Sequence, residues 1–231
     1  MMKTLIVALG TLVMAGMAHA GFPPDEVINP HNRVPCGLET VCIDWNFAEG
    51  DQGFLPAVCE PGGLPVWEYG PTTFIPGAPG DVWGTVLQAN YLNDSGDGLC
   101  SPEFAVTADC YLMEVYHYYD IETNYDGGNV TVNGVVVAPD GGYDATISTS
   151  TSFYAWCVDL EEGFTGHENT WASDCFDLSA FIGQNVIVCF DFGSDSSVTY
   201  PGWYIAQVQI GGPEGTPVDG DTWGTIKHLF K

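Results

Sequence analysis

Basic residues are almost absent from this chain of 231 residues, which has 4 Lys and Arg against 30 Asp and Glu and a formal net charge of −26. Binding to nucleic acid depends on clustered Lys and Arg, so this class of partner is excluded. An anionic membrane surface is disfavoured for the same electrostatic reason. Such acidity suits divalent cations, a salty medium or plain solubility, and composition does not choose among these three.

Several motifs of catalysis and metal binding are also missing. The chain has no His-Glu-x-x-His, no Gly-x-Ser-x-Gly and no Cys-x-x-Cys, which removes the usual signatures of zinc peptidases, serine hydrolases and zinc clusters. A pair of carboxylates that cleaves glycans stays open, because the many acidic residues always supply candidates. We therefore predict a chain that is not an enzyme, with no catalytic residue assigned.

Long hydrophobic runs are confined to the N-terminus. Lys3 precedes the apolar run Leu5–Met17, and Ala18-His19-Ala20 follows it. This is the layout of a signal peptide over 1–20 that is cleaved after Ala20. The run is too short to span a bilayer comfortably, and no later run is longer, so we expect no membrane span and a secreted or cell-surface protein.

The part of the chain after residue 20 has 8 cysteines. An even number behind a signal peptide predicts disulfides formed in an oxidising compartment. Eight cysteines allow 105 pairings. We predict one of them, Cys157 with Cys175, because these residues flank an expected reversal at Gly163–Gly166.

Helical periodicity is missing as well, and short alternating segments separated by Gly-rich turns take its place. This pattern predicts an all-β fold, a two-sheet antiparallel β-sandwich (jelly roll) stabilised by disulfides, over residues 36–211. An irregular lead-in covers 21–35, and a linker with a short C-terminal tail covers 212–231. The expected strands are 42–47, 82–89, 103–107, 111–121, 129–137, 152–158, 170–176, 185–192 and 203–210.

The most informative stretch is the middle one. We expect Tyr111–Ile121 and Asn129–Val137 to form a long β-hairpin, with Asp126-Gly127-Gly128 supplying the positive-φ residues of the reversal. Side chains alternate along a strand, so two faces are predicted for the first of these segments. The apolar face has Met113, Val115, His117, Tyr119 and Ile121; the acidic and aromatic face has Glu114, Tyr116, Tyr118, Asp120 and Glu122.

Candidate site residues lie on the second face. Tyr116 and Tyr118, with Glu114 beside them, can stack on a sugar ring; the alternative is that both rings pack beneath loops. Asp120, Glu122 and Asp126 can hold a cation such as calcium; the alternative is a solvated strand end with turn chemistry at Asp126. His117, on the apolar face, is interpreted as a hydrogen-bonded core histidine.

The order of motifs between about Leu112 and Ile210 resembles the MAM-like jelly-roll domain appended to secreted immune-inhibitor-A-type metallopeptidases. The matching pieces include Tyr125-Asp126-Gly127-Gly128-Asn129, Pro139-Asp140-Gly141-Gly142-Tyr143, Gly163-Phe164-Thr165-Gly166, Trp171, Asp177-Leu178-Ser179, Gly183-Gln184-Asn185, Phe190-Asp191-Phe192-Gly193-Ser194-Asp195 and Gly202-Trp203-Tyr204. The resemblance implies an accessory module without the peptidase domain.

Two departures bear on calcium. Domains of this kind often have Asp-Phe-Glu in the first strand and Ile-Asp-Asp-Val in the last, where this chain has Asn46-Phe47-Ala48 and Ile205-Ala206-Gln207-Val208. Losing those carboxylates together removes the hard oxygen ligands that calcium prefers. We predict no cofactor, with calcium as an open possibility at Asp120, Glu122 and Asp126.

The functional prediction has three forms. The first is an exported, non-catalytic module with a binding, adhesion or surface-structural role and an unknown extracellular partner or glycan. The second is a carbohydrate-binding module that uses the acidic and aromatic face, and the third is a glycan-acting enzyme. The tail, with Trp223, Ile226, Leu229 and Phe230 at helical spacing, is predicted to be a separable interaction element.

Overall fold

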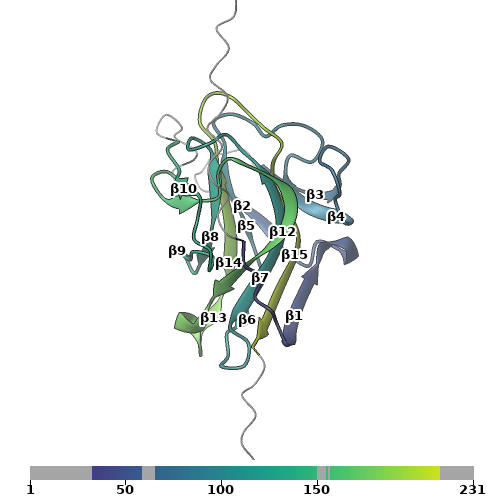
Figure 1. Ribbon diagram of the computed structural model, residues 1–231, viewed down its shortest axis with the longest axis vertical. Coiled ribbons are helices and arrows are strands. Elements are labelled where there is room, and N and C mark those ends of the chain that lie inside the picture. The colour runs from purple at the N-terminus through teal and green to yellow at the C-terminus, as the bar shows by residue number, and fades with distance from the viewer. Residues whose placement is uncertain (1–32, 59–65, 150–154, 156, 214–231) are drawn as a thin grey trace, which may run out of the picture.

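The computed structural model describes residues 33–58, 66–149, 155 and 157–213, and Figure 1 shows two β-sheets packed face to face. The predicted signal peptide, most of the lead-in and the tail from residue 214 lie outside the described residues. No helix in the described part is both long and apolar enough to cross a membrane.

The larger sheet has six strands, in the order β12-β7-β15-β4-β3, with β1 also paired to β15. The smaller one has five, in the order β2-β5-β14-β8-β9. All pairings are antiparallel, which confirms the predicted β-sandwich. The strands of the larger sheet are β1 (Thr40–Asn46), β3 (Trp67–Pro71), β4 (Asp81–Thr85), β7 (Leu112–Asp120), β12 (His167–Asp177) and β15 (Gly202–Gly212). Those of the smaller are β2 (Leu55–Val58), β5 (Gly96–Cys100), β8 (Gly127–Val132), β9 (Val135–Val136) and β14 (Val188–Gly193).

Four short strands form two more pairs outside these sheets: β6 (Phe104–Ala105) with β13 (Asn185–Val186), and β10 (Ala145–Thr146) with β11 (Glu162–Gly163). The 3₁₀ turns η1 (Phe47–Glu49) and η3 (Ser179–Phe181) follow β1 and β12. Most of the expected strands are present with shifted ends. The expected strand 152–158 falls largely outside the described residues, and Cys157 and Val158 lie in a turn.

The long central hairpin is wrong, because β7 belongs to the six-stranded sheet and β8 to the five-stranded one. The two glycines that suggested a tight reversal begin β8 instead, and Asn124 is the residue with a left-handed backbone (φ 68°). A Cβ added at Gly128 would lie 2.6 Å from the Trp203 ring, and one at Gly127 would lie 2.6 Å from the Phe164 carbonyl oxygen. Both glycines are therefore required by close packing rather than by a turn, Gly128 against the six-stranded sheet and Gly127 against the segments that hold Ile147 and Phe164.

The core between the sheets is aromatic and centres on Trp203. Its ring centroid lies 5.7 Å from those of Trp67 and Phe190 and 5.6 Å from that of Phe164. Tilted and edge-on pairs of this kind add about 0.5–1.5 kcal/mol each beyond the burial of apolar area. The predicted apolar face of β7 is confirmed, since its inward-facing side chains are at most 1 % exposed: Met113, Val115, His117 and Tyr119.

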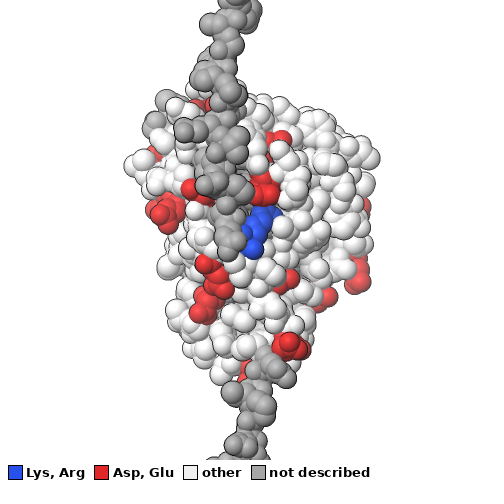
Figure 2. Space-filling view, in the orientation of Figure 1, with Lys and Arg blue, Asp and Glu red and all other residues white. Residues whose placement is uncertain are grey.

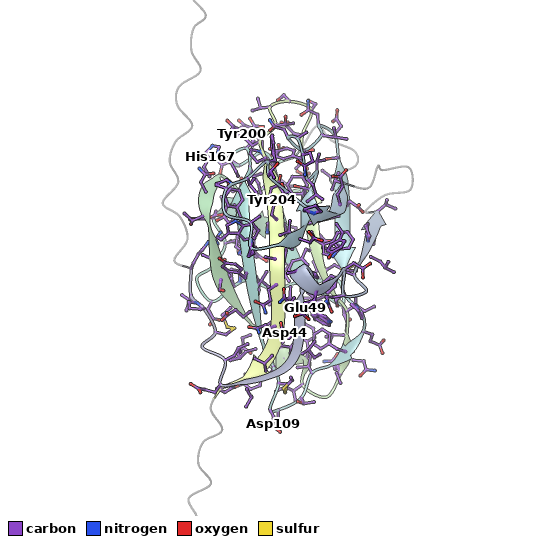
Figure 3. All side chains as sticks on the ribbon, turned by 90° about the vertical axis from the view of Figure 1, so that its right-hand side faces the viewer. Asp44, Glu49, Asp109, His167, Tyr200 and Tyr204 are labelled. Atoms are coloured by element: carbon purple, nitrogen blue, oxygen red, sulfur yellow. A yellow bond between two sulfur atoms is a disulfide. The ribbon has the colours of Figure 1, made fainter. Side chains whose placement is uncertain are left out.

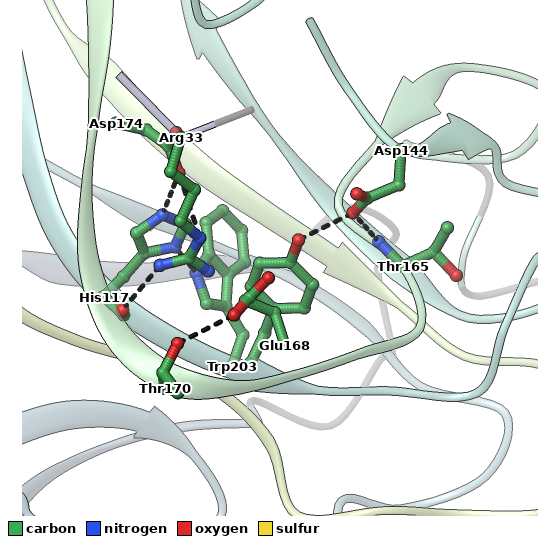
Figure 4. Close-up of polar contacts among 9 residues, drawn as sticks. Arg33, His117, Asp144, Thr165, Glu168, Thr170, Asp174 and Trp203 are labelled. Carbon is green, nitrogen blue, oxygen red and sulfur yellow. Dashed lines mark hydrogen bonds and ion pairs between the residues drawn. The ribbon is translucent and has the colours of Figure 1, made fainter. Parts of the chain in front are cut away.

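A chain of polar contacts crosses this core (Figure 4). The Trp203 indole N–H donates to Nδ1 of His117 at 2.8 Å, so the ring proton sits on Nε2 and is donated to Asp174 at 2.6 Å. The Arg33 guanidinium approaches Asp174 to 3.8 Å and lies over the Tyr119 ring. The prediction that His117 is a hydrogen-bonded core histidine is thereby confirmed.

The predicted disulfide between Cys157 and Cys175 is wrong. Cys175 on β12 is bonded to Cys36, which lies 139 residues earlier in the chain. Cys157 is disulfide-bonded too, and no described cysteine is free. The prediction assumed a disulfide across a local reversal. The disulfides that the structure describes instead join segments far apart in sequence, as Cys42–Cys110 and Cys100–Cys189 also do.

Candidate functional site

The outer face of the six-stranded sheet carries two adjoining hollows, with volumes of about 230 Å³ and 200 Å³. Tyr116 and Gln207 line both of them, and we call the pair the groove. The first hollow is also lined by Glu114, Ser173 and Gln209, and the second by Asn46, Ala48, Pro79, Asp81 and Ala206.

Strand register explains why these side chains converge. Tyr116 on β7 lies opposite Ser173 on β12 and Gln207 on β15, and Glu114 lies opposite Gln209. The register shifts between Ile205 and Gln207, which makes a bulge at that point of β15. One extra residue reverses the alternation, so that Gln207 and Gln209 face outward together with Tyr204.

Glu114 is a positioned carboxylate at one end of the groove. Its Oε2 accepts a hydrogen bond of 2.8 Å from the backbone N–H of Cys36, and the disulfide from Cys36 to Cys175 ties that segment to the strand beside Glu114. Its Oε1 makes no hydrogen bond to any described residue, and the side chain lines the first hollow. The carboxylate is thus partly oriented before any ligand arrives.

The other end of the groove is built by β1 and by the connection that precedes β4. Gln207 donates its side-chain N–H to Asp44 at 2.7 Å, and Asn46 is its neighbour across the ladder. A Cβ added at Gly80 would lie 2.8 Å from the Cβ of Ala48, so the two segments are in close contact there. Figure 3 looks onto this side of the molecule, with Asp44 labelled below Tyr204.

The two predicted ligand-binding tyrosines differ in environment. Tyr116 is half-buried and lines the groove, with its ring centroid 5.6 Å from that of Trp171. Tyr118 is only 3 % exposed, packs against Tyr204 and Val82, and has its pKa raised to about 12, mainly by burial. Two alternatives were open for these rings, stacking on a sugar and packing beneath loops. The burial of Tyr118 agrees with the second.

The predicted cation ligands are only partly brought together. Ligand atoms of Glu122 and Asp126 lie within 4.8 Å of each other and of Asp195, which the sequence reading did not include. Asp126 accepts hydrogen bonds of 2.6 Å from the Tyr91 hydroxyl and from the Asp195 backbone N–H. Asp120 lies apart from this cluster and contacts Nδ1 of His167 at 2.5 Å.

We expect unfolding stability to respond weakly to calcium. The positions where the MAM-like domains that the sequence resembles have carboxylates are Asn46, Ala48, Ala206 and Gln207 here, and Asn46 and Gln207 are neighbours across the β1–β15 ladder. A ligand at one hundred times its dissociation constant stabilises by about 2.7 kcal/mol, which thermal melting with calcium and with EDTA would detect. A large rise in melting temperature that EDTA reverses would contradict this prediction and point to Glu122, Asp126 and Asp195.

Comparison with known proteins finds partial similarity to segments of larger proteins. No protein-family model matches it. Bacillopeptidase F of Bacillus subtilis is 30 % identical over 148 residues, which cover 62 % of this chain and 9 % of that protein. The pre-pro-metalloprotease PrtV of Vibrio cholerae is 28 % identical over 93 residues, which cover 40 % of this chain and 9 % of that protein. The matched segments thus span about a tenth of the length of these relatives.

Among solved structures, the K1 cleaved adhesin domain of Lys-gingipain from Porphyromonas gingivalis W83 is similar over 74 % of this chain and 98 % of that one, with a TM-score of 0.46 and 16 % identity. The CBM35 of Paenibacillus barcinonensis is similar over 74 % and 99 %, with a TM-score of 0.37 and 12 % identity. The chain is a β-sandwich that resembles such domains.

Proposed function

We propose that this chain is an exported, non-catalytic module that binds an extracellular glycan in the groove. The observation that carries the proposal is the groove itself, where an aromatic ring and several amide and carboxylate side chains converge on the outer face of one sheet. Sites for small polar ligands have this composition, with apolar contact area and a few placed polar groups. Secretion or display at the cell surface accords with the predicted signal peptide and the disulfides.

The surroundings of the groove favour a glycan over an extended peptide. An extended peptide usually binds by adding a strand to an exposed sheet edge. Both β7 and β15 are paired on each side next to the groove, so neither offers an unpaired edge there. Recognition on this face must therefore use side chains, and Tyr116 offers a ring on which a sugar can stack.

A glycan-acting enzyme has less support. Such enzymes need two carboxylates that face each other across the scissile bond, about 5–10 Å apart. Two carboxylates line the groove among the described residues, but they lie in different hollows, Glu114 in the first and Asp81 in the second, and neither hollow has a pair. We therefore assign binding and no hydrolysis.

Removing the ring of Tyr116 should abolish most glycan binding. In Tyr116→Ala we expect at least a tenfold weaker interaction, because truncating an aromatic anchor at the centre of a site commonly costs about 2 kcal/mol or more. Depletion assays with chitin, chitosan, cellulose, xylan and β-1,3-glucan, followed by calorimetry with soluble oligomers, provide the measurement.

Tyr125→Ala is the matched control, because Tyr125 is 52 % exposed and does not line the groove. It should bind like the unaltered protein, and both variants should keep their melting temperatures within a few degrees. Equal loss of binding in the two variants, or no binding of the unaltered protein to any polymer of the panel, would contradict the proposal.

A further inference from the structure

We propose that the groove selects glycans with primary ammonium groups, such as chains of deacetylated glucosamine, over uncharged and acidic glycans. This inference rests on the proposed function and adds the chemical class of the ligand. It follows from the hydrogen-bonding state of the side chains that line the groove and from the charge around them.

Several groups that line the groove can still accept a hydrogen bond from a ligand. Glu114 lines the first hollow and uses Oε2 for the Cys36 backbone N–H, while its Oε1 has no hydrogen-bond partner among the described residues. Gln207 gives one side-chain N–H to Asp44, which leaves its amide oxygen and its second N–H for a ligand. Asp81 lines the second hollow. The amides and Ser173 can donate or accept, whereas the two carboxylates only accept, so a ligand that brings N–H donors meets Glu114 and Asp81 better than one that brings further acceptors.

No described cation neutralises these carboxylates. Arg33 is the only Lys or Arg among the described residues, and its guanidinium contacts Asp174 and the backbone oxygen of His117 rather than the groove. Figure 2 shows a single blue patch and several red ones on the face in view. With a formal net charge of −26, the protein repels uronate and sulfate groups and attracts ammonium groups.

Tyr116 contributes to the same preference. Tyr116 lies on the same face of β7 as Glu114, is paired with Gln207 on β15 and lines both hollows. The face of a tyrosine ring attracts a cation that lies within about 6 Å of its centroid. An amino sugar that stacks on this ring can therefore direct its ammonium group to the carboxylate of Glu114, where a charge-assisted hydrogen bond is stronger than one between neutral groups.

The test compares glucosamine oligomers with N-acetylated oligomers of equal length. The two ligands have the same sugar ring and differ in charge. We expect the amine oligomer to bind at least tenfold more tightly at low ionic strength. The advantage should shrink at about 0.15 M salt, because the screening length falls from about 30 Å at 0.01 M to about 8 Å. Calorimetry at pH 5.5 keeps both ligands soluble and the amines protonated.

Glu114→Gln isolates the charge, because the amide oxygen can still accept the Cys36 N–H. This variant should lose about tenfold in affinity for the amine oligomer, which corresponds to about 1.4 kcal/mol, and should be unchanged toward the acetylated one. Glu161→Gln, at an exposed carboxylate that does not line the groove, changes the net charge equally and should bind both ligands like the unaltered protein.

The outcomes separate the two levels of the proposal. Equal or tighter binding of the acetylated oligomer would overturn the ammonium preference while the proposed glycan binding stands. Binding of tetralysine that depends on Glu114, without binding of the amine oligomer, would overturn the glycan class. Binding of none of these probes or of the neutral polymers would overturn both.

Discussion

Gly128→Ala should destabilise the protein by about 3 kcal/mol or more, at the upper end of the usual cost of overpacking a core. The new Cβ would lie 2.6 Å from ring carbons of Trp203 and 2.7 Å from the backbone oxygen of Asp191. Neither neighbour can withdraw easily, since Trp203 is fully buried among other rings and Asp191 belongs to the paired strand β14. In a domain of this size the melting temperature should fall by roughly 6–12 °C.

Gly134→Ala is the matched control for this prediction. No atom lies within 4 Å of a Cβ built at Gly134, although its φ of +77° favours glycine. The cost should therefore stay near 1 kcal/mol, which is the backbone term alone. Equal destabilisation of the two variants, measured by chemical unfolding, would show that close packing of β8 against Trp203 is not what requires a glycine at 128.

Stability should fall as the pH rises from about 4 to about 8. Burial raises the pKa of Asp126 to about 8 and that of Asp97 and Asp191 to about 6, above the ordinary value of 3.8. Within this window the folded state holds protons that the unfolded state has released, so unfolding becomes easier as the pH increases. Each such group lowers the free energy of unfolding by up to about 1.4 kcal/mol per pH unit.

Different residues are responsible for the lower and the upper part of this pH range. Of these three, Asp97 and Asp191 contribute up to about pH 6, and Asp126 continues to contribute from there to about pH 8. Asp126→Asn should therefore flatten the upper half of the profile, and Asp140→Asn, at an exposed carboxylate, should leave it unchanged. Urea unfolding in EDTA at intervals of half a pH unit measures this. A rise in stability between pH 6 and 8, or an unaltered slope in Asp126→Asn, would contradict the assignment.

Local patterns predicted those parts of the fold that depend on one strand at a time. Alternation along β7 correctly placed Met113, Val115 and His117 in the core, because a strand that covers a core must alternate. The same alternation placed Glu114 and Tyr116 on the outer face, where the groove lies. The β-sandwich followed from many short strands and the absence of helical periodicity.

Features that depend on contacts between distant segments could not be predicted in this way. Gly127 and Gly128 have the composition of a turn, and only the position of Trp203 and Phe164 shows that they are packing positions. The bulge in β15 turns Gln207 outward, and no local pattern marks it. In the sequence, Gln207 stands out only as a replacement for a carboxylate.

The site itself shows the same division. Tyr118 and Tyr116 lie on the same face of β7. The segment before β4 contributes Ile75 to the buried cluster that contains Tyr118. The backbone oxygen of Pro76, in the same segment, accepts a hydrogen bond from the indole N–H of Trp171. The alternation of residues along β7 does not show which of these two tyrosines a distant loop will cover. For the same reason the cation ligands were predicted only in part, since Asp195 approaches Asp126 from another strand end.

The most direct test of the binding site uses the side-chain amides of Gln207 and Gln209, which line the groove on the outer face of β15. Their NH₂ signals can be followed by NMR while an amine-bearing glucosamine oligomer is added to the isotopically labelled protein. We predict that both signals, with the backbone amide of Tyr116, shift in a saturable manner and that the signals of Tyr125 stay in place. Saturable shifts confined to residues outside the groove, with Gln207 and Gln209 unmoved, would contradict the account.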